Sequence, residues 1–325
     1  MNGGEDDPWT FRMRRGDFAG AWAISDAALP VHRGVPCWHW PRHLQYVWTG
    51  EPLEGRRVLV RCYHGLGDTV QFARFLPRLK SIAAEVNVWV QPELLALLRG
   101  LRGVDRLLPL HDGRPEIACD AEIELAELAH YFRVDERVLA TEVPYLSARA
   151  AKWIADATDE GEPAVGIVWR GGNWDAQRSI PPAVLEPLAA VPGVSWHIVQ
   201  QAPESHAPFI ARPGAGATSP VNALASVIAA LDLLITIDSL PAHLGGALGV
   251  PTWTLLPANA DWRWMEHRAD SPWYPTMRLF RQQQAGRWED VIETVTNELR
   301  LFVAARARRS MAAAARDQAG KQQPA

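Results

Sequence analysis

The sequence predicts an α/β protein with two Rossmann-like domains that face a shared cleft. Two apolar, β-branched segments, 56–63 and 231–237, have the composition of parallel strands that are buried on both faces. Each runs directly into a turn and a helix, at 64–69 and 238–243, so two helix N-termini with free amides follow two buried strands. Because ligands of open α/β sheets bind at the carboxyl ends of the strands, the two turns predict one binding cleft between two domains.

Length and composition agree with this prediction. A chain of 325 residues with 48% hydrophobic and 22% charged residues is longer than one core usually fills. The net charge of −4, without a basic stripe, argues against a nucleic-acid partner. Three widely spaced cysteines, Cys37, Cys62 and Cys119, argue against a disulfide framework or a zinc cluster. No signal peptide or membrane-spanning run is found, so we expect a soluble cytoplasmic protein.

Residues 1–50 differ from the rest and predict a short helical extension. Phe18, Trp22 and Leu29 have helical spacing, and the Gly-Asp-Phe sequence at 16–18 is similar to the middle of a tetratricopeptide repeat. One repeat cannot bury its own apolar face. We therefore expect a helix pair that packs on the first domain, with a peptide-binding role as the alternative.

Strand and helix patterns alternate from residue 56 onward. A first domain is expected at 51–158, a second at 159–311, and an Ala, Arg and Gln-rich, disordered tail at 312–325. The further strand candidates are 85–91, 106–110, 164–169, 196–200 and 251–257. The further helix candidates are 92–101, 148–157 and 287–308, and 121–131 reads either as a helix or as a strand followed by a helix.

Three ordered motifs resemble glycosyltransferase family nine, which includes the bacterial heptosyltransferases. They are GLGDTVQFARFLP at 65–77, DS with AHL and GALG within 238–249, and DWRW, SPWYP and LFRQ within 261–282. The motifs are closest to the branch of the family that is fused to tetratricopeptide repeats. The resemblance covers roughly residues 40–300 and implies a GT-B fold, with the acceptor side in the first domain and the nucleotide-sugar side in the second.

The same resemblance implies an activity. We expect a hexosyl- or heptosyltransferase-like enzyme that moves a sugar from a nucleotide-activated donor to a hydroxyl of a glycan, lipid-linked or protein acceptor. The transfer is expected to invert the anomeric carbon and to need no metal ion and no cofactor beyond the nucleotide-sugar co-substrate.

Asp68, at the mouth of the first turn, is the candidate catalytic residue. Inverting transfer needs a base for the proton of the acceptor hydroxyl, and a carboxylate at a strand's carboxyl end suits that role. The alternative is an N-cap aspartate whose oxygen accepts a backbone amide two or three residues on. Gly65 and Gly67 allow close approach and positive φ in the donor-binding turn. Val70 stands where a dinucleotide-binding motif has its third glycine, which argues against an NAD site.

The second turn carries the candidate donor-binding residues Asp238, Ser239 and His243. His243, one turn into the helix, either donates to a diphosphate oxygen or is a buried histidine that bonds a backbone carbonyl. We expect Asp238 to cap the helix, because a carboxylate cannot attract a phosphate. Pro241 has no N–H and removes one possible phosphate donor.

A polar loop after the strand at 164–169 adds two further candidates. By resemblance, Arg178 and Ser179 place a cation and a hydroxyl against the donor phosphates, and arginine can contact phosphate with two parallel bonds. The alternative for Arg178 is a solvated loop side chain. Gln200 and Gln201 stand where relatives carry a Gln-Lys pair, and the missing lysine weakens that site.

Two other functions compete with the transferase. A nucleotide-sugar epimerase on the same fold would place several carboxylates around the sugar, whereas only Asp68 is identified. A non-catalytic, transferase-like binding module would tolerate changes such as Pro241 and Gln201. The chain has 15 tryptophans, most of which we expect in the core, and DWRW at 261–264 either lines the donor base or shapes its turn.

Overall fold

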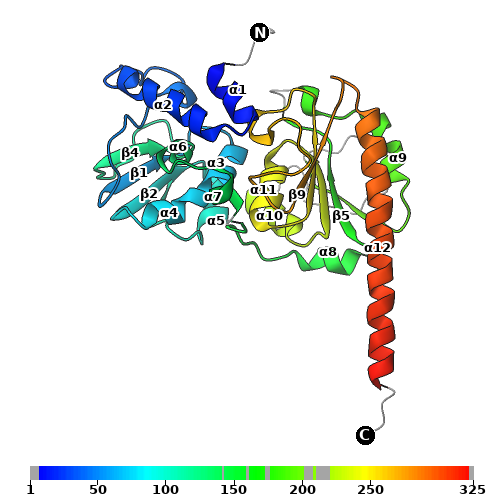
Figure 1. Cartoon of the computed structure of the whole chain (residues 1–325). Coiled ribbons are helices and arrows are strands. Elements are labelled where there is room, and N and C mark those ends of the chain that lie inside the picture. Colours follow the sequence, from blue (N-terminus) through cyan, green and yellow to red (C-terminus); the bar gives the residue numbers. More distant parts are fainter. Residues whose placement is uncertain are drawn as a thin grey trace.

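The computed structural model of the protein describes residues 7–140, 143–158, 161–172, 176–200, 208–209 and 220–321. Its two separate sheets, each flanked by helices, lie beside one another in Figure 1. All strand pairs that join named strands are parallel. The predicted α/β class with two Rossmann-like domains is confirmed.

The first sheet has the strand order β3-β2-β1-β4. Its central strand, β1 (Arg57–Arg61), places Val58 opposite both Val86 and Ala121, so apolar residues of three strands meet in the core. The remaining elements are α3 (Leu66–Phe72), η2 (Ala73–Phe75), α4 (Leu76–Lys80), β2 (Glu85–Val90), η3 (Pro92–Leu94), α5 (Leu95–Leu98), β3 (Arg106–Pro109), β4 (Ala121–Glu124), α6 (Glu127–Tyr131) and α7 (Glu136–Ala140). Residues 121–131 therefore form a strand and a helix.

The second sheet has the strand order β6-β5-β7-β8-β9. Its elements are β5 (Ala164–Val168), η4 (Ala176–Arg178), η5 (Pro182–Leu185), α9 (Glu186–Ala189), β6 (Ser195–Ile198), α10 (Val221–Ile228), β7 (Leu233–Ile237), α11 (Leu240–Leu248), β8 (Thr252–Leu256), η6 (Trp262–Trp264) and β9 (Met277–Arg281). The strand pattern had not identified β9. Its side chains are mostly buried, but Arg278 in its second position is exposed. The strand pairs with β8 at the edge of the sheet.

Two further helices complete the two domains, one connecting them and one at the C-terminal end. The connecting helix α8 (Lys152–Ala157) is shorter than expected, and α12 (Glu289–Lys321) extends away from the body of the molecule in Figure 1. The backbone stays helical through 312–321, where the sequence predicted a disordered tail. Alanine, arginine and glutamine are good helix formers, which accounts for this difference. Among the helices that the structure describes, none combines the length and the apolar character needed to cross a membrane.

The N-terminal extension consists of α1 (Pro8–Arg14), α2 (Phe18–His32) and η1 (Arg42–Leu44). The helix pair contacts the first domain, where the indole nitrogen of Trp22 donates to the carbonyl of Val134 at 2.8 Å. It also contacts the second domain, where Trp9 packs edge-on against Trp262 with ring centroids 5.1 Å apart. The extension therefore bridges the two domains, beyond the packing on the first domain that we expected.

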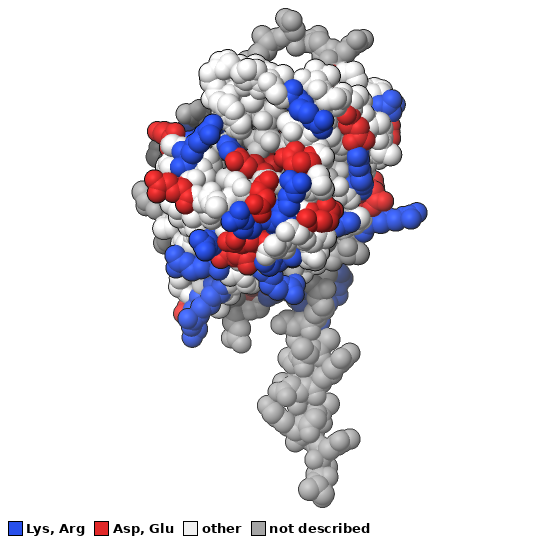
Figure 2. Space-filling model, turned by 90° about the vertical axis from the view of Figure 1, so that its left-hand side faces the viewer, with Lys and Arg blue, Asp and Glu red and all other residues white. Residues whose placement is uncertain are grey.

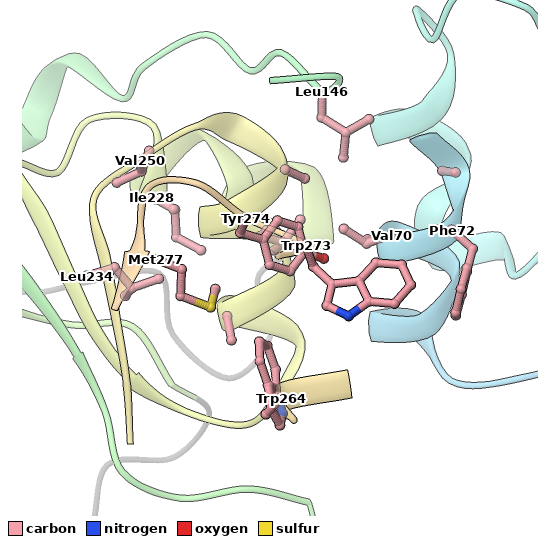
Figure 3. Packing of buried hydrophobic residues seen from close by; sticks show 14 of the residues in the cluster. Val70, Phe72, Leu146, Ile228, Leu234, Val250, Trp264, Trp273, Tyr274 and Met277 are labelled. Atoms are coloured by element: carbon pink, nitrogen blue, oxygen red, sulfur yellow. The ribbon is translucent and has the colours of Figure 1, made fainter. Parts of the chain in front are cut away.

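The two domains meet in an apolar interface. Figure 3 shows Trp273 of the second domain pointing toward Val70 and Phe72 on α3 of the first. The rings of Trp273 and Phe72 lie 5.7 Å apart in an edge-on contact. Arg74, which is buried, donates to the carbonyl of Trp273 at 2.8 Å. This packing brings α3 and α11 against one another and holds the two turns face to face.

Candidate functional site

The first turn connects β1 to α3, and Asp68 lies inside the first turn of that helix. Gly65 occupies the N-cap position, and its amide donates to Oδ2 of Asp68 at 3.0 Å. The N-cap alternative for Asp68 is therefore wrong, because the helix begins earlier than expected and Asp68 is its third residue. Neither glycine uses the positive φ that glycine allows: Gly65 has φ −68°, and Gly67 is not among the glycines with positive φ.

Asp68 forms an ion pair with an arginine from the other domain. Nη2 of Arg263 lies 2.6 Å from Oδ1 of Asp68, and Nη1 lies 3.0 Å from Asp261. Burial opposes the charge on Arg263, but the surrounding carboxylates, Asp261 first among them, outweigh burial and raise its pKa. The Asp68 side chain keeps 29% of its surface exposed, so the carboxylate still faces open space.

The second turn has a different arrangement. Asp238 is buried, and Nη1 of Arg178 lies 3.2 Å from its Oδ2 and donates to its backbone carbonyl at 3.2 Å. The expected capping role of Asp238 is wrong, because Ser239 holds the N-cap position and Asp238 faces Arg178 instead. The Ser239 hydroxyl donates to the carbonyl of Ile237 at 3.2 Å and makes no capping bond. Burial raises the pKa of Asp238, although Arg178 acts in the opposite direction.

His243 is a buried, neutral histidine at the contact between the domains. Its Nδ1 lies 3.0 Å from the hydroxyl of Tyr274, and its ring stacks on Trp264. Its partner is therefore a side-chain hydroxyl and not the backbone carbonyl that the alternative assumed. Burial, followed by nearby arginines, lowers the pKa of His243 well below its ordinary value. A Cβ atom on Gly67 would lie 2.8 Å from the His243 ring, so the close approach expected at Gly67 is to the facing domain.

The polar loop of the second domain is held by two side chains. The hydroxyl of Ser179 accepts a bond from the amide of Gly171 at 3.1 Å. The side-chain oxygen of Gln200 accepts bonds from the amides of residues 169 and 170 at 2.8 and 3.0 Å. Both side chains thus hold the loop backbone in place through hydrogen bonds to its amides. Gln201 lies outside the described residues.

The two turns and the loop enclose a polar cleft of about 620 Å³ between the domains. It is lined by His64, Gly65, Leu66, Gly67, Asp68, Gly171, Gly172, Arg178, Asp238, Ser239, Leu240, His243, Asp261 and Arg263. The structure therefore brings together every predicted site residue except Ser179, which lines a neighbouring pocket. Three carboxylates and two guanidinium groups face one another here, beside the N-terminus of α11.

A second space, the aromatic cavity, has a volume of about 870 Å³ and adjoins the polar cleft. It is lined by Trp9, Trp22, Ser25, Ala28, Leu29, His32, Trp40, Pro41, His43, Leu44, Gln45, Tyr46, Trp48, His64, Asp68, Phe72, Glu124, Ala126, Glu127, Ala129, His130, Trp262 and Arg263. His64, Asp68 and Arg263 line both spaces. The Asp68–Arg263 ion pair therefore stands at the boundary between a polar cleft and an apolar cavity.

The polar cleft combines groups that favour an anion with three carboxylates that oppose one. Free amides at the start of α11 and the positive end of its dipole favour a negative group, and Arg178 and Arg263 supply two cations. Pro241, the second residue of α11, contributes no N–H. Within the described ranges, no three His, Cys, Asp or Glu side chains are grouped closely enough to hold a metal ion.

Sequence reasoning had not assigned His64, Asp261 or Arg263 to the site. The signal for two of them was present in the DWRW motif at 261–264, whose role had been left open between ligand contact and turn formation. The structure shows that Asp261 accepts from the Arg263 amide at 3.1 Å and also pairs with its guanidinium group. The motif thus shapes the turn and also aims Arg263 at Asp68.

Comparison with known proteins supports the fold. No family model matches the chain. Protein FlbA of Caulobacter vibrioides is 27% identical over 301 residues, which are 79% of this chain and 48% of that protein. The chain thus spans about half the length of this curated relative.

Two solved structures have a similar architecture. ADP-heptose lps heptosyltransferase II of E. coli superposes with a TM-score of 0.54 and 14% identity, over 77% of this chain and 99% of that chain. The family 9 glycosyl transferase of Veillonella parvula DSM 2008 gives a TM-score of 0.49 and 16% identity, over 71% and 87%. The likeness to heptosyltransferase II confirms the expected GT-B fold.

Proposed function

We propose that this protein is a glycosyltransferase that moves a sugar from a nucleotide-activated donor to an acceptor hydroxyl, with inversion and without a metal ion. The observation that carries the proposal is the position of Asp68, whose carboxylate lines both the polar cleft and the aromatic cavity. A donor whose diphosphate lies in the cleft and an acceptor that lies in the cavity would meet at this residue.

The reaction at this boundary can be written as one displacement. The acceptor oxygen forms a bond to the anomeric carbon while the bond from that carbon to the phosphate oxygen breaks. Asp68 takes the proton of the acceptor hydroxyl, and the nucleoside diphosphate leaves with the electron pair. Attack from the face opposite the leaving group inverts the anomeric carbon.

The leaving diphosphate would be stabilised by groups that the chain already holds in place. The amides at the start of α11, Arg178 and Arg263 face the cleft from the second domain. If the Tyr274 hydroxyl donates to Nδ1 of His243, then Nε2 carries the hydrogen and donates to a phosphate oxygen. These groups would donate hydrogen bonds to the diphosphate in place of a metal ion, with Arg178 and Arg263 each also paired with a carboxylate.

One observation bears on the epimerase alternative. The cleft brings Asp68, Asp238 and Asp261 together, which is more carboxylates than the sequence had identified. All three carboxylates face an arginine, but of the three only Asp68 also lines the aromatic cavity. We therefore assign Asp238 and Asp261 the role of orienting Arg178 and Arg263. The transferase is therefore favoured, and an epimerase would convert the donor sugar without any acceptor.

Binding and turnover of the full chain test the proposal. The relative with the similar fold is named for ADP-heptose, so ADP and ADP-sugars come first, followed by UDP and GDP sugars. We expect one nucleoside diphosphate to bind by titration calorimetry, and its sugar to be transferred to an acceptor hydroxyl with unchanged turnover in EDTA. Absence of binding to every diphosphate contradicts the function, and turnover that EDTA abolishes and magnesium restores contradicts the metal-independent mechanism.

A further inference from the structure

The aromatic cavity lies where three parts of the chain meet. Trp9, Trp22 and Leu29 of the N-terminal helices form one wall, Phe72 and neighbouring residues of the first domain form another, and Trp262 closes the side toward the second domain. The extension thus contributes directly to a space that reaches Asp68.

The rings of the walls support one another. Trp9 packs edge-on against Trp262 with centroids 5.1 Å apart, which joins the extension to the second domain. His32 and Tyr46 stack at 3.6 Å with their planes within 5° of parallel. Contacts between aromatic rings stabilise their relative orientation. The cavity is therefore largely preformed, as expected of a small-molecule site.

The indole nitrogens of three of the lining tryptophans have hydrogen-bond partners within the protein. Nε1 of Trp9 donates to the hydroxyl of Ser25 at 3.1 Å, and Nε1 of Trp22 donates to the carbonyl of Val134 at 2.8 Å. Nε1 of Trp48 likewise donates to a backbone carbonyl at 2.8 Å. These rings consequently offer hydrocarbon surface to the cavity.

Two acidic groups of the cavity, Glu124 and Glu127, hold their protons more strongly than usual. Burial raises the pKa of Glu124 to about 7 and that of Glu127 to about 8. The amide of Ala126 donates to Glu124 at 2.6 Å, and the amide of Glu124 donates to Glu127 at 2.8 Å, so both carboxyl groups are held by backbone. Burial also lowers the pKa of His130, which favours the neutral ring. At pH 7, Glu127 is thus mostly protonated and Glu124 is about half protonated, beside the ion pair of Asp68 and Arg263.

The outer surface above the extension has the same character. Figure 2 shows Lys and Arg mixed with Asp and Glu over the lower part of this face, whereas the upper part, over the N-terminal helices, is largely uncharged. Leu44 lines the cavity and is 53% exposed.

We infer that the aromatic cavity binds the acceptor through an uncharged aromatic or aliphatic group next to its reactive hydroxyl, and that the N-terminal extension thereby determines acceptor specificity. This inference rests on the proposed glycosyltransferase function. An acceptor seated in this way would direct its hydroxyl toward Asp68, the residue that the cavity shares with the polar cleft. An ionised group in the same place would lose its hydration, while Asp68 and Arg263 are already paired with one another.

Two fluorescent probes that differ in one charge test the inference on the full chain. We expect neutral N-phenyl-1-naphthylamine to bind with a stoichiometry of one, and its anionic relative 1-anilinonaphthalene-8-sulfonate to bind about tenfold more weakly or not at all. Ala28→Trp puts an indole into the cavity that Ala28 lines and should weaken the neutral probe by about tenfold or more. Ala27→Trp is the matched control, because Ala27 is the exposed neighbour on the same helix.

A second pair of variants covers the case in which Ala28→Trp does not fold. Leu44→Asp adds a charge at the exposed rim and should also weaken the neutral probe, whereas Val31→Asp, on a side chain that is 70% exposed and outside the cavity, should not. Equal effects of variant and control, or equal affinity for the two probes, overturn the inference. Selective loss of the neutral probe in a chain that binds no nucleoside diphosphate would instead support the cavity and contradict the proposed function.

Discussion

The two strand-to-helix turns of this protein are alike in sequence and different in chemistry. Each follows the central part of a parallel sheet, and each carries an aspartate near the start of the helix. Asp68 lies within the first turn of α3 with 29% of its side chain exposed, whereas Asp238 precedes α11 with 2% exposed. One carboxylate faces open space on two sides, and the other is enclosed with an arginine.

The difference shows that position after a strand is not enough to assign a role. Asp68 pairs with Arg263 and remains accessible, which suits a group that must contact a substrate hydroxyl. Asp238 has Arg178 against its carboxylate and its carbonyl, which suits a group that aims a cation at a ligand. The predictions below test this division of roles between the first and the second turn.

The largest effect is expected when the two aspartates are replaced in the same way. Asp68→Asn preserves shape but cannot take a proton, and loss of a general base typically lowers turnover by about 10²–10⁴-fold. Donor affinity should change little, because Arg263, the partner of Asp68 that faces the diphosphate, is also held by Asp261. Asp238→Asn is the control and should reduce turnover by less than about tenfold, since it only orients Arg178.

Turnover, donor affinity and melting temperature are measured for both variants. Near wild-type turnover of Asp68→Asn would remove the catalytic role, and an equal loss in both variants would abolish the distinction between the turns.

The surroundings of the first turn should make stability depend on pH. The amide of Tyr63, next to the turn, donates to Glu124, whose pKa burial raises from 4.5 to about 7. The folded state therefore holds a proton that the unfolded state has released, and stability falls as pH rises from 4.5 through 7. A shift of this size is worth on the order of 3 kcal/mol.

Glu124→Gln should reduce that fall, because glutamine does not titrate, while Glu127, whose pKa is raised to about 8, maintains the remainder. Urea unfolding of both proteins between pH 5 and pH 8 measures the slope. The same slope in the variant would show that Glu124 is not the group responsible.

The second turn should determine donor affinity. Arg178→Ala removes a cation from the polar cleft, and loss of a hydrogen bond to a charged group costs about 1.5–3 kcal/mol, or roughly 10–150-fold in affinity. Arg170→Ala is the control, because Arg170 is an exposed residue of the same loop that does not line the cleft. Calorimetric titration with the preferred nucleoside diphosphate measures both. Equal affinity of the two variants would mean that Arg178 does not contact the donor.

The smallest effect is expected where the two turns touch. Gly67→Ala would place a Cβ 2.8 Å from the His243 ring, and that ring is held by Tyr274 and Trp264. Overpacking typically costs about 1–3 kcal/mol, partly offset here by about 1 kcal/mol of better helix propensity. Gly65→Ala meets only the Asp68 side chain, at 3.1 Å, and serves as the control. A lower melting temperature for Gly65→Ala than for Gly67→Ala would contradict a direct contact between the turns.

Much of the fold could be predicted because it depends on local sequence. The apolar runs at 56–63 and 231–237 became β1 and β7, and the helical spacing in the extension became α2. Prediction of secondary structure from the sequence failed where a segment was short or where its composition fitted more than one structure. β9 was missed because its exposed Arg278 interrupts the apolar pattern, and the helix at 312–321 was read as disorder from its low complexity.

The sequence by itself determined two buried parallel strands, the two turns after them, and the residue types that those turns present. Strand and turn formation depend on neighbouring residues, so these features are readable without the fold. Only the tertiary structure decided which charges meet. Arg263 reaches Asp68 from 195 residues away, and Arg178 reaches the carbonyl of Asp238 from 60 away. The aromatic cavity likewise exists only because the extension docks across both domains. The pairing of Arg263 with Asp68 depends on how the two domains pack against one another, and that of Arg178 with Asp238 on how the fold of the second domain brings two of its loops together. No local pattern encodes either distance.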